Sequence, residues 1–538
     1  MSELNHVNSK KNIILYLVLI LTLGLTLRFY YFPYDVPIAT DGFFSFVYAM
    51  KTVFDSGLPV GYTTTNTGWS NFLSMFFVFA DTSDPLHLMD IQRTLSIVLS
   101  TLTAITSFFI FRRFVDTRWA LLGSFLLAVE PRLLLISIEG INYSLYFFLF
   151  VLTTALFLKK TDVSLFLSFV CIACATLIRY EGLLLLIPFS IMYFLKFKDK
   201  RSIVRFLGII FIVMIILIPI SVLRMQATEN YCYESYFGIV CGQDGTLNNI
   251  FGASMFIEKH IISESQDLDD PIYAETDISV LDNFVYLGSS NLIKFLGLSL
   301  IPFFIFFIIL RLGIFIKNIK FPKLDFDKAT ILLTTCIMLL PAVYAYGRGI
   351  EEIRYVLVAV PILCILSISG ISLISFKISK NNSALIVLII LVIASSIIFI
   401  ESQNNDYAMY KEAFLVSQEI VKMTHITNTF TYSGFIKVAE LFDTWPEIPN
   451  HNEVGKIKND FIKISTNNYD DVLELIIDSK KYDLKYLVVD RNNKFFDDLR
   501  ENQSDYKYLH KIVLNNFEQI TNYSVYEINY EILLEYEK

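Results

Sequence analysis

Long apolar runs are the feature that most constrains this chain, because a segment of about 20 apolar residues can cross a lipid bilayer as a helix. Hydrophobic residues make up 54% of the 538-residue chain and charged residues only 18%, a composition that excludes an ordinary soluble globular protein. The sequence predicts a mainly α, polytopic transmembrane bundle over residues 1–400. About eleven spans are expected, at residues 12–28, 87–110, 118–136, 143–158, 163–177, 182–195, 203–223, 291–310, 329–343, 355–374 and 383–400.

Basic residues gather in alternate loops between these runs, which predicts how the chain crosses the membrane. Under the positive-inside rule such loops lie in the cytoplasm. The first run lacks a small-residue cleavage site after it, so we expect a retained anchor in a multi-pass cell-membrane protein, with the amino terminus inside and the carboxyl terminus outside. The basic groups are Lys10 and Lys11; Arg112, Arg113 and Arg118; Lys159 and Lys160; Lys196, Lys198, Lys200, Arg201 and Arg205; Lys317, Lys320, Lys323 and Lys328; and Lys377 and Lys380.

Two long loops are predicted on the external face, at residues 31–86 and 224–290. The second loop is acidic and holds Cys232 and Cys241, a candidate disulfide in an oxidising compartment. Free thiols at these positions are the alternative, and a metal site is disfavoured because no histidine lies near enough to complete a ligand set. The other four cysteines fall within apolar runs, where a cysteine behaves as a small hydrophobic residue.

The tail, residues 401–538, is polar and alternates between helix-like and strand-like patterns. Helices are predicted at 406–423, 435–443, 469–479 and 495–499, and strands at 429–432, 461–465, 484–489, 511–514 and 524–530. Such alternation is typical of a small α/β domain, which we expect on the extracytoplasmic face. The tail has no glycine-rich nucleotide loop, so we expect it to support the site or recognise the acceptor and not to carry out catalysis.

Carboxylates and arginines collect at the predicted external ends of the spans, where a charge is costly unless it is paired or used. A site in which a base deprotonates an acceptor while cations hold a phosphate leaving group would have this composition. Ordinary interfacial residues, either solvated or paired as Arg179 with Glu181, are the alternative. The groups are Asp41; Glu130, Arg132 and Glu139; Arg179 and Glu181; and Arg348, Glu351, Glu352, Arg354 and Tyr355.

Four short motifs, taken in order, resemble those of a known class of membrane enzymes. They are Ala-Thr-Asp-Gly-Phe at residues 39–43, Arg-Thr-Leu-Ser at 93–96, Glu-Pro at 130–131 with Ser-Ile-Glu-Gly at 137–140, and Arg-Tyr at 354–355 with Pro361. On these motifs, residues 1–400 resemble the GT-C class of membrane glycosyltransferases, in particular the protein-mannosyltransferase-like group related to glycosyltransferase family 39. The chain is more distantly similar to the catalytic subunit of oligosaccharyltransferases.

The resemblance implies a role for each matched residue. Asp41 would be the catalytic base for an acceptor hydroxyl, or would activate an acceptor amide. Glu139 would be the second acid of the site and, with Asp41, a ligand of a divalent metal ion if the oligosaccharyltransferase pattern applies. Arg354 and Tyr355 would bind the phosphate of a polyprenyl-linked sugar donor, helped by further arginines, namely Arg348, Arg93 and Arg179. Arg93 has a second interpretation, a simple pairing with Asp90.

Two departures from the family pattern bear on the substrate. Many relatives carry two adjacent acids in the first loop, whereas Gly42 follows Asp41 here and Asp35 is the only nearby substitute. The tail has no Trp-Trp-Asp-Tyr-Gly signature, which favours transfer of a single sugar from a polyprenyl (dolichyl) phosphate over en bloc transfer of an oligosaccharide. The expected partners are this donor, the lipid bilayer and a protein, lipid or glycan acceptor, with no nucleic acid. A transporter or flippase of lipid-linked sugars is the competing class, but the sequence shows no internal repeat.

Overall fold

Helices dominate the chain because a segment in lipid must satisfy every backbone N–H and C=O within itself. In the computed structural model of the whole chain, the described residues are 4–39, 41–55, 66–80, 84–228, 313, 325–347, 353–378, 382–403, 407–423, 426–428, 434–444, 462–464, 466, 469–491, 493–512 and 522–536. Within these ranges, five helices are long and apolar enough to cross a membrane, or six if the bent pair α5 (Thr117–Ala128) and α6 (Pro131–Ile138) counts as one span. The chain is a membrane protein built mainly of helices.

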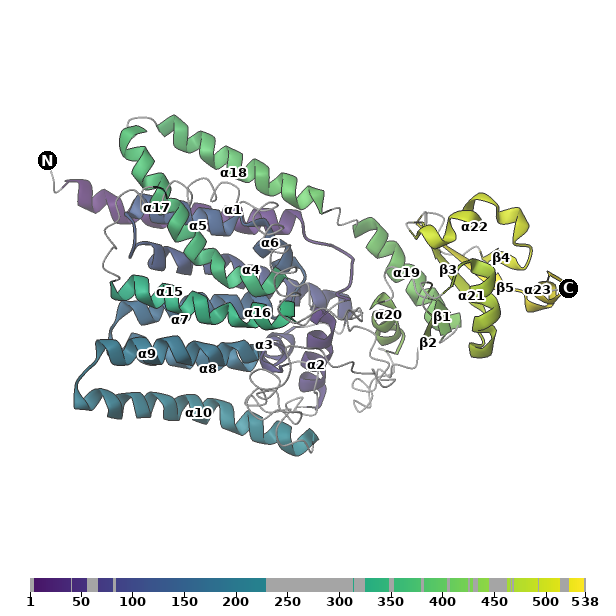
Figure 1. Cartoon of the computed structure of the whole chain (residues 1–538), viewed down its shortest axis with the longest axis horizontal. Helices are drawn as coiled ribbons and strands as arrows, with labels where there is room; N and C mark the ends of the chain where they lie inside the picture. Colours follow the sequence, from purple (N-terminus) through teal and green to yellow (C-terminus); the bar gives the residue numbers. More distant parts are fainter. Residues whose placement is uncertain are drawn as a thin grey trace.

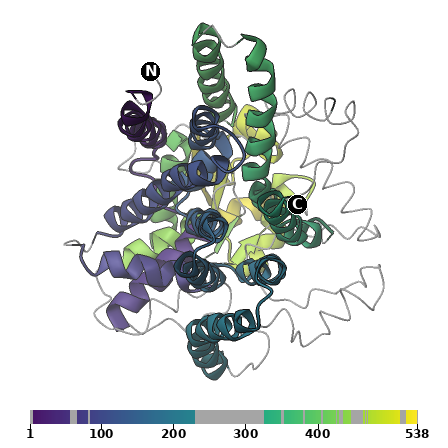
Figure 2. The ribbon, with the colours of Figure 1, turned by 90° about the vertical axis from the view of Figure 1, so that its left-hand side faces the viewer.

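The long helices lie side by side with roughly parallel axes (Figure 1), and Figure 2 shows many of them end-on. Two short helices, α2 (Asp41–Asp55) and α3 (Gly68–Phe77), lie at one end of the bundle, which we call the site end, and the opposite end is the far end. The other bundle elements are α1 (Leu4–Tyr30), α4 (Pro85–Phe111), α7 (Tyr143–Lys159), α8 (Asp162–Ile178), η1 (Tyr180–Leu185), α9 (Leu186–Lys196), α10 (Lys200–Thr228), α15 (Phe326–Met338), α16 (Leu340–Gly347), η2 (Ile353–Ala359), α17 (Val360–Ile378) and α18 (Asn382–Ser402).

These helices overlap ten of the predicted spans, and the predicted span at 291–310 lies outside the described residues. One prediction needs correction, because the run at 118–136 is not one straight helix. It is divided into α5 and α6, which are bent by 46°. The break occurs because Pro131, the first residue of α6, has no N–H to donate to the preceding turn.

Side chains from other helices satisfy the backbone carbonyls exposed at this break. The Ala128 carbonyl accepts a hydrogen bond from Arg28 Nη1 at 2.7 Å, and the Val129 carbonyl accepts one from Ser396 Oγ at 2.6 Å. These donors come from α1 and α18, at the two ends of the membrane part of the chain. Helices α1 and α18 thus supply hydrogen-bond donors to the bend, because non-helical backbone within a membrane must have its polar groups satisfied by other parts of the protein.

Arg28 is fully buried and makes its hydrogen bonds without any carboxylate among the residues described. Besides the carbonyl at the break, it donates to the Gly24 carbonyl at 3.0 Å, to Ser100 Oγ at 3.0 Å and to Ser137 Oγ at 3.1 Å. One guanidinium therefore joins α1, α4, α5 and α6. A buried cation of this kind is stable only while its donors are used.

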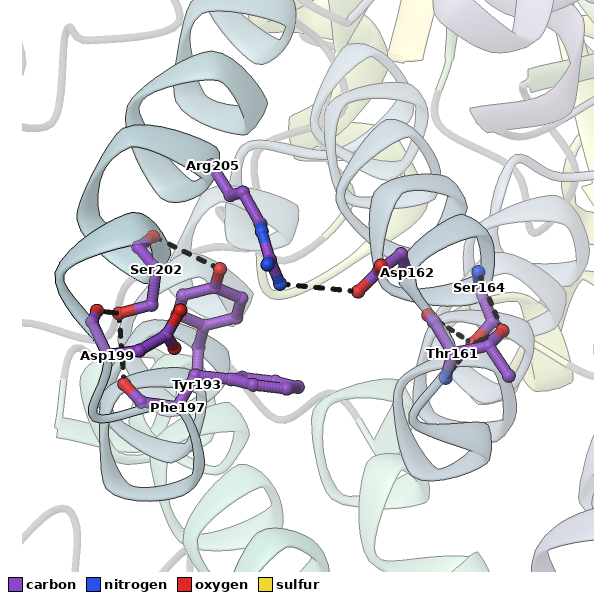
Figure 3. A network of polar contacts seen from close by, with 8 residues as sticks. All are labelled: Thr161, Asp162, Ser164, Tyr193, Phe197, Asp199, Ser202 and Arg205. Carbon is purple, nitrogen blue, oxygen red and sulfur yellow. Dashed lines mark hydrogen bonds and ion pairs between the residues drawn. The ribbon is translucent and has the colours of Figure 1, made fainter.

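At the far end, the turns between α7 and α8 and between α9 and α10 are short and internally hydrogen-bonded (Figure 3). The Thr161 hydroxyl caps the start of α8. The Tyr193 hydroxyl donates to the Ser202 carbonyl at 3.1 Å, and Arg205 of α10 lies 3.7 Å from the Asp162 carboxylate of α8. These contacts hold the two turns beside each other.

The tail lies beyond the site end of the bundle (Figure 1). Its strands form two sheets. The first is a parallel pair of β1 (Ile426–Asn428) and β2 (Ile462–Ile464). The second is antiparallel, in the order β3-β5-β4, with β3 at Tyr486–Asp490, β4 at Leu509–Ile512 and β5 at Tyr523–Ile528. The accompanying helices are α19 (Tyr407–Met423), α20 (Gly434–Thr444), α21 (Val472–Ser479), α22 (Asp497–Glu501) and α23 (Tyr530–Tyr536). The predicted strand at 429–432 lies outside the described residues, and the domain boundary at residue 400 stays a prediction.

Replacing Arg28 with leucine should strongly destabilise the bundle, because the carbonyl of Ala128 and the hydroxyls of Ser100 and Ser137 lose their donor. Each buried polar group left without a partner costs about 1–3 kcal/mol. We expect a clear fall in the Tm of the protein in detergent micelles, followed by intrinsic fluorescence. The exposed Arg118→Leu variant is the control, and an equal Tm for the two variants would contradict the role assigned to Arg28.

Gly68→Ala should also lower the Tm, because a Cβ at this position would lie 2.4 Å from the Leu177 carbonyl oxygen of α8. The neighbour is backbone and cannot move aside, so α3 would have to shift away from α8. We expect a loss of about 2 kcal/mol. Gly208→Ala provides the matched control, since a Cβ there meets no atom within 4 Å. Wild-type Tm values for both variants would show that α3 is not packed against α8 in this way.

Candidate active site

Asp41 and Arg354 meet at the site end although 313 positions separate them in the sequence. Asp41 is the first residue of α2, where a carboxylate is favoured by the helix dipole. Arg354 belongs to η2, and its Nη1 lies 2.8 Å from Asp41 Oδ2. The Asp41 side chain is 62% exposed and that of Arg354 21% exposed, so the carboxylate faces solvent. An exposed ion pair of this kind is weak, and a stronger ligand can displace one partner.

Glu139 lies beside the start of α2. A Cβ placed on Gly42 would come within 3.0 Å of the Glu139 carbonyl oxygen and 2.7 Å of Ile38 Cγ2. The side chains of Asp41 and Glu139 are both exposed. A second acid at position 42 would therefore collide with Ile38 and with the turn that carries Glu139.

Two buried side chains hold this junction together. The amide nitrogen of Gln92, on α4, donates to the carbonyls of both Gly42 and Gly140 at 2.8 Å. The indole Nε1 of Trp69, on α3, donates to the same Gly140 carbonyl at 3.1 Å. Gly140 has a φ of +71°, a conformation that favours glycine. Helices α2, α3, α4 and α6 are thus tied together behind the two carboxylates.

Arg179 is held within a cluster of polar and aromatic side chains next to η2. Its Nη2 pairs with Glu181 Oε1 at 2.8 Å, and its Nη1 donates to Asn142 Oδ1 at 3.4 Å. The guanidinium carbon lies 5.8 Å from the ring centroid of Tyr146 and 5.7 Å from that of Tyr355. Cation–π contacts and the ion pair together occupy this arginine. The pairing with Glu181, which the alternative interpretation of the sequence gives, is present, and donor binding by Arg179 stays a prediction.

The charge of Arg354 also reaches this cluster. Burial works against ionisation of Glu181, yet the Arg179 guanidinium holds the pKa of this carboxyl below its ordinary value, and Arg354 adds to the effect. Arg354 therefore lies between two carboxylates, one exposed at Asp41 and one largely buried at Glu181. Tyr355, the next residue, packs against Arg179. The order along this edge of the site is carboxylate, cation, aromatic ring and second cation.

Arg93 lies buried beneath the site. Its Nε donates to the Ile138 carbonyl at 3.1 Å and its Nη1 to the Val36 carbonyl at 2.6 Å. Asp90 is 3.6 Å away, as the second interpretation of the sequence expects. These contacts give Arg93 a structural task, which is to hold the segment before α2 and the end of α6 onto α4. Asp35, the possible substitute for a second acid, pairs instead with Lys411 of α19 at 3.1 Å.

The remaining predicted site residues are placed differently. Glu130 is buried at the bend between α5 and α6, and Arg132 lies 5.1 Å from the ring centroid of Phe399. Arg348, Cys232 and Cys241 lie outside the described residues, so the proposed disulfide stays a prediction. Gln92, Trp69 and Asn142 went unnoticed in the sequence because neutral side chains within or beside apolar runs carry no distinctive pattern.

The donor set for a metal ion is small. Among the residues that the structure describes, no group of three or more histidine, cysteine, aspartate or glutamate side chains is gathered. Asp41 and Glu139 would provide two carboxylates, a donor type that suits a hard divalent cation. Two carboxylates fall short of such a group, so the metal site that the resemblance implies stays a prediction.

No family model matches the chain, and no curated protein matches it in sequence. Solved structures do match. The Archaeoglobus fulgidus oligosaccharyltransferase in complex with Zn and sulfate has a TM-score of 0.53 at 13% identity, over 88% of this chain and 68% of that chain. The same enzyme tethered to an acceptor peptide with the NVT sequon gives 0.53 at 14% identity, over 89% and 69%.

A third match is AglB, the archaeal oligosaccharyltransferase of A. fulgidus, in complex with an inhibitory peptide and a dolichol-phosphate. Its TM-score is 0.54 at 13% identity, over 91% of this chain and 70% of that chain. At this level of identity the likeness establishes the fold. The chain has the fold of an archaeal oligosaccharyltransferase, which is the more distant of the two similarities that its motifs suggested.

Proposed function

We propose that the protein is a membrane glycosyltransferase that moves a sugar from a polyprenyl-phosphate carrier to an acceptor at the site end. The observation that carries the proposal is the Asp41–Arg354 pair, which places an exposed carboxylate base and a cation side by side. Glu139 supplies a second exposed carboxylate on the adjoining turn. The shared fold with an oligosaccharyltransferase supports an enzyme of this type.

The chemistry follows from these positions. Asp41 takes the proton from the acceptor, whose oxygen or nitrogen then forms a bond to the anomeric carbon of the donor. The bond between that carbon and the phosphate oxygen breaks, and the phosphate leaves with the electron pair. Arg354 holds the charge that develops on it. Attack and departure on opposite faces invert the anomeric carbon.

Arg354 cannot serve the phosphate and Asp41 equally, so the donor changes the ion pair. A phosphate accepts bidentate hydrogen bonds from a guanidinium and is the stronger partner. Once Arg354 turns to the donor, the Asp41 carboxylate is available to the acceptor. Arg179 and Glu181 support this exchange, because they fix Tyr355 and leave Arg354 a second carboxylate nearby. Direct donor contacts by Arg93, Arg179 or Arg348 belong to the same proposal only as secondary interactions.

A divalent metal ion, if the reaction uses one, would be held by Asp41 and Glu139. It would polarise the phosphate or the acceptor as a Lewis acid.

En bloc transfer of an oligosaccharide to an asparagine is the second candidate, and the fold favours it. One neighbour carries a tethered acceptor peptide with the NVT sequon and another a dolichol-phosphate. Against it stands the tail, which lacks the Trp-Trp-Asp-Tyr-Gly signature. The two candidates share Asp41 and Arg354 and differ in what the carrier delivers and in the range of acceptors. Supplying single-sugar and oligosaccharide donors separately distinguishes them.

Asp41→Asn should lower kcat for sugar transfer by about a hundredfold or more, because asparagine cannot accept the proton. The measurement uses purified protein with radiolabelled polyprenyl-phosphate sugars and, in parallel, a lipid-linked oligosaccharide. Donor binding should be retained, since the change removes a competitor for Arg354. Asp35→Asn is the control, because Asp35 is another acid of this loop and pairs with Lys411. Equal turnover by wild type and Asp41→Asn would remove Asp41 from catalysis, and donor movement across liposomes without transfer would favour a transporter.

Arg354→Gln should reduce kcat/KM for the donor by about a hundredfold, since glutamine cannot neutralise the leaving phosphate. Arg354→Lys should recover part of the loss, because it keeps the charge but not the bidentate geometry. Lys411→Gln removes another cation at the site end and should leave kcat/KM near the wild-type value. The assignment of Arg354 is wrong if the Gln and Lys variants lose activity equally and bind the donor as wild type does.

A further inference from the structure

Two threonine hydroxyls inside the bundle have no hydrogen-bond partner within the part of the chain that the structure describes. They belong to Thr153 of α7 and Thr334 of α15, and both side chains are buried. A threonine in a helix commonly donates to the carbonyl one turn back, as Thr154 does to Phe150 at 2.9 Å. A buried hydroxyl without a partner destabilises the fold, so each of the two needs an explanation.

The hydroxyl of Thr334 is turned away from its own helix. One turn earlier on α15, Thr330 Oγ1 donates to the Phe326 carbonyl at 2.7 Å. Thr334 does not repeat this bond, although it stands in the same relation to the Thr330 carbonyl. A helical threonine has two common rotamers, and only one of them brings the hydroxyl to the carbonyl one turn back. The Thr334 hydroxyl is therefore available to a partner outside α15.

A small cavity separates the two cases, because Thr334 borders it and Thr153 does not. The cavity lies between α4, α7, α15 and α17 and has a volume of about 10 Å³. A single water molecule needs roughly this much space, about 10–15 Å³, so any larger ligand is excluded. The lining contains three hydroxyls, those of Thr154, Thr334 and Thr335, among apolar side chains that include Phe150, Ile331 and Pro361.

The three hydroxyls offer a water molecule the partners that it requires. A buried water commonly makes about three hydrogen bonds, and in lipid no bulk water can replace them. The Thr154 proton is used by the Phe150 carbonyl, so the Thr154 oxygen remains an acceptor. Thr334 can donate, and Thr335 supplies a further hydroxyl on the same helix. None of the described residues that line the cavity is charged, so an ion would have no counter-charge there.

We propose that this cavity holds one buried water molecule, which accepts a hydrogen bond from Thr334 Oγ1 and donates one to Thr154 Oγ1. The water joins α15 to α7 through two hydroxyls that make no direct hydrogen bond with each other. Hydrogen bonds between membrane helices stabilise their packing. The cavity also borders Pro361, the second residue of α17, so the water lies beside the junction with η2, which carries Arg354. This site does not depend on glycosyl transfer.

Thr334→Val tests the water through the sign of its effect on the Tm of the full chain in detergent micelles. Valine has a similar shape but no hydroxyl, so the water loses its donor while Thr154 still needs a partner. We expect a Tm lower by about 1–2 °C. Thr153→Val is the matched control, because it removes an unsatisfied hydroxyl that does not border the cavity. Its Tm should equal or exceed the wild-type value.

A Thr334→Val Tm at or above the wild-type value would overturn the proposal. Removing an unsatisfied hydroxyl from a dry site is neutral or stabilising, so the variant would then behave as Thr153→Val does.

The water itself can be detected by X-ray radiolysis of the full chain, in which a bound water releases a hydroxyl radical that oxidises an adjacent side chain. Phe150 borders the cavity, whereas Phe147, one turn earlier on α7, does not, and both rings are buried. Mass spectrometry should find Phe150 oxidised several-fold more than Phe147 in wild type and in Thr153→Val. Thr334→Val should lose this excess. Equal oxidation of the two rings in wild type would contradict the proposal, and this comparison decides even if Thr334→Val does not fold.

Discussion

The bundle depends on one requirement, that every backbone polar group within a membrane must find a partner. The bend between α5 and α6 breaks the internal ladder of a span, and Arg28 and Ser396 replace the missing bonds. Because α6 leaves the bend at 46°, its end and the turn at Glu139 come to lie against the start of α2. The polar interactions inside the bundle and the geometry of the candidate site therefore have one origin.

Much of the fold could be predicted from the sequence, since apolar runs report directly on the segments that lipid surrounds. Most helices of the bundle and most strands of the tail follow from such patterns, and the number of membrane spans stays a prediction. The bend between α5 and α6 was not predicted, although Pro131 lies at it. An isolated proline in an apolar run also occurs in continuous helices, so it does not by itself indicate a bend. The order β3-β5-β4 was likewise out of reach, since short strands of similar composition give no register until their neighbours are known.

The candidate site was predictable where it carries charge and hidden where it does not. Asp41 and Arg354 stood out because a charge at a membrane surface needs a partner or a use, and the structure pairs them. The roles of Gln92 and Trp69 depend on carbonyls that belong to distant turns, so no local pattern announces them. Arg93 and Arg179 show the opposite case, since the sequence marks them as charged but only the contacts show how far each is already occupied.

The close contact at Gly42 has a consequence for how the site can move. A side chain at Gly42 has no room for even one added carbon. Gln92 donates to the carbonyls of both Gly42 and Gly140, so α2 and the turn at Gly140 form one rigid unit. On the opposite side lies η2, a 3-10 segment whose hydrogen bonds are weaker than those of an α-helix. A substrate bound between Asp41 and Arg354 would thus contact a rigid segment, α2, on one side and a more easily deformed segment, η2, on the other. In the proposed reaction, Asp41 would therefore keep its place while Arg354 moves toward the donor.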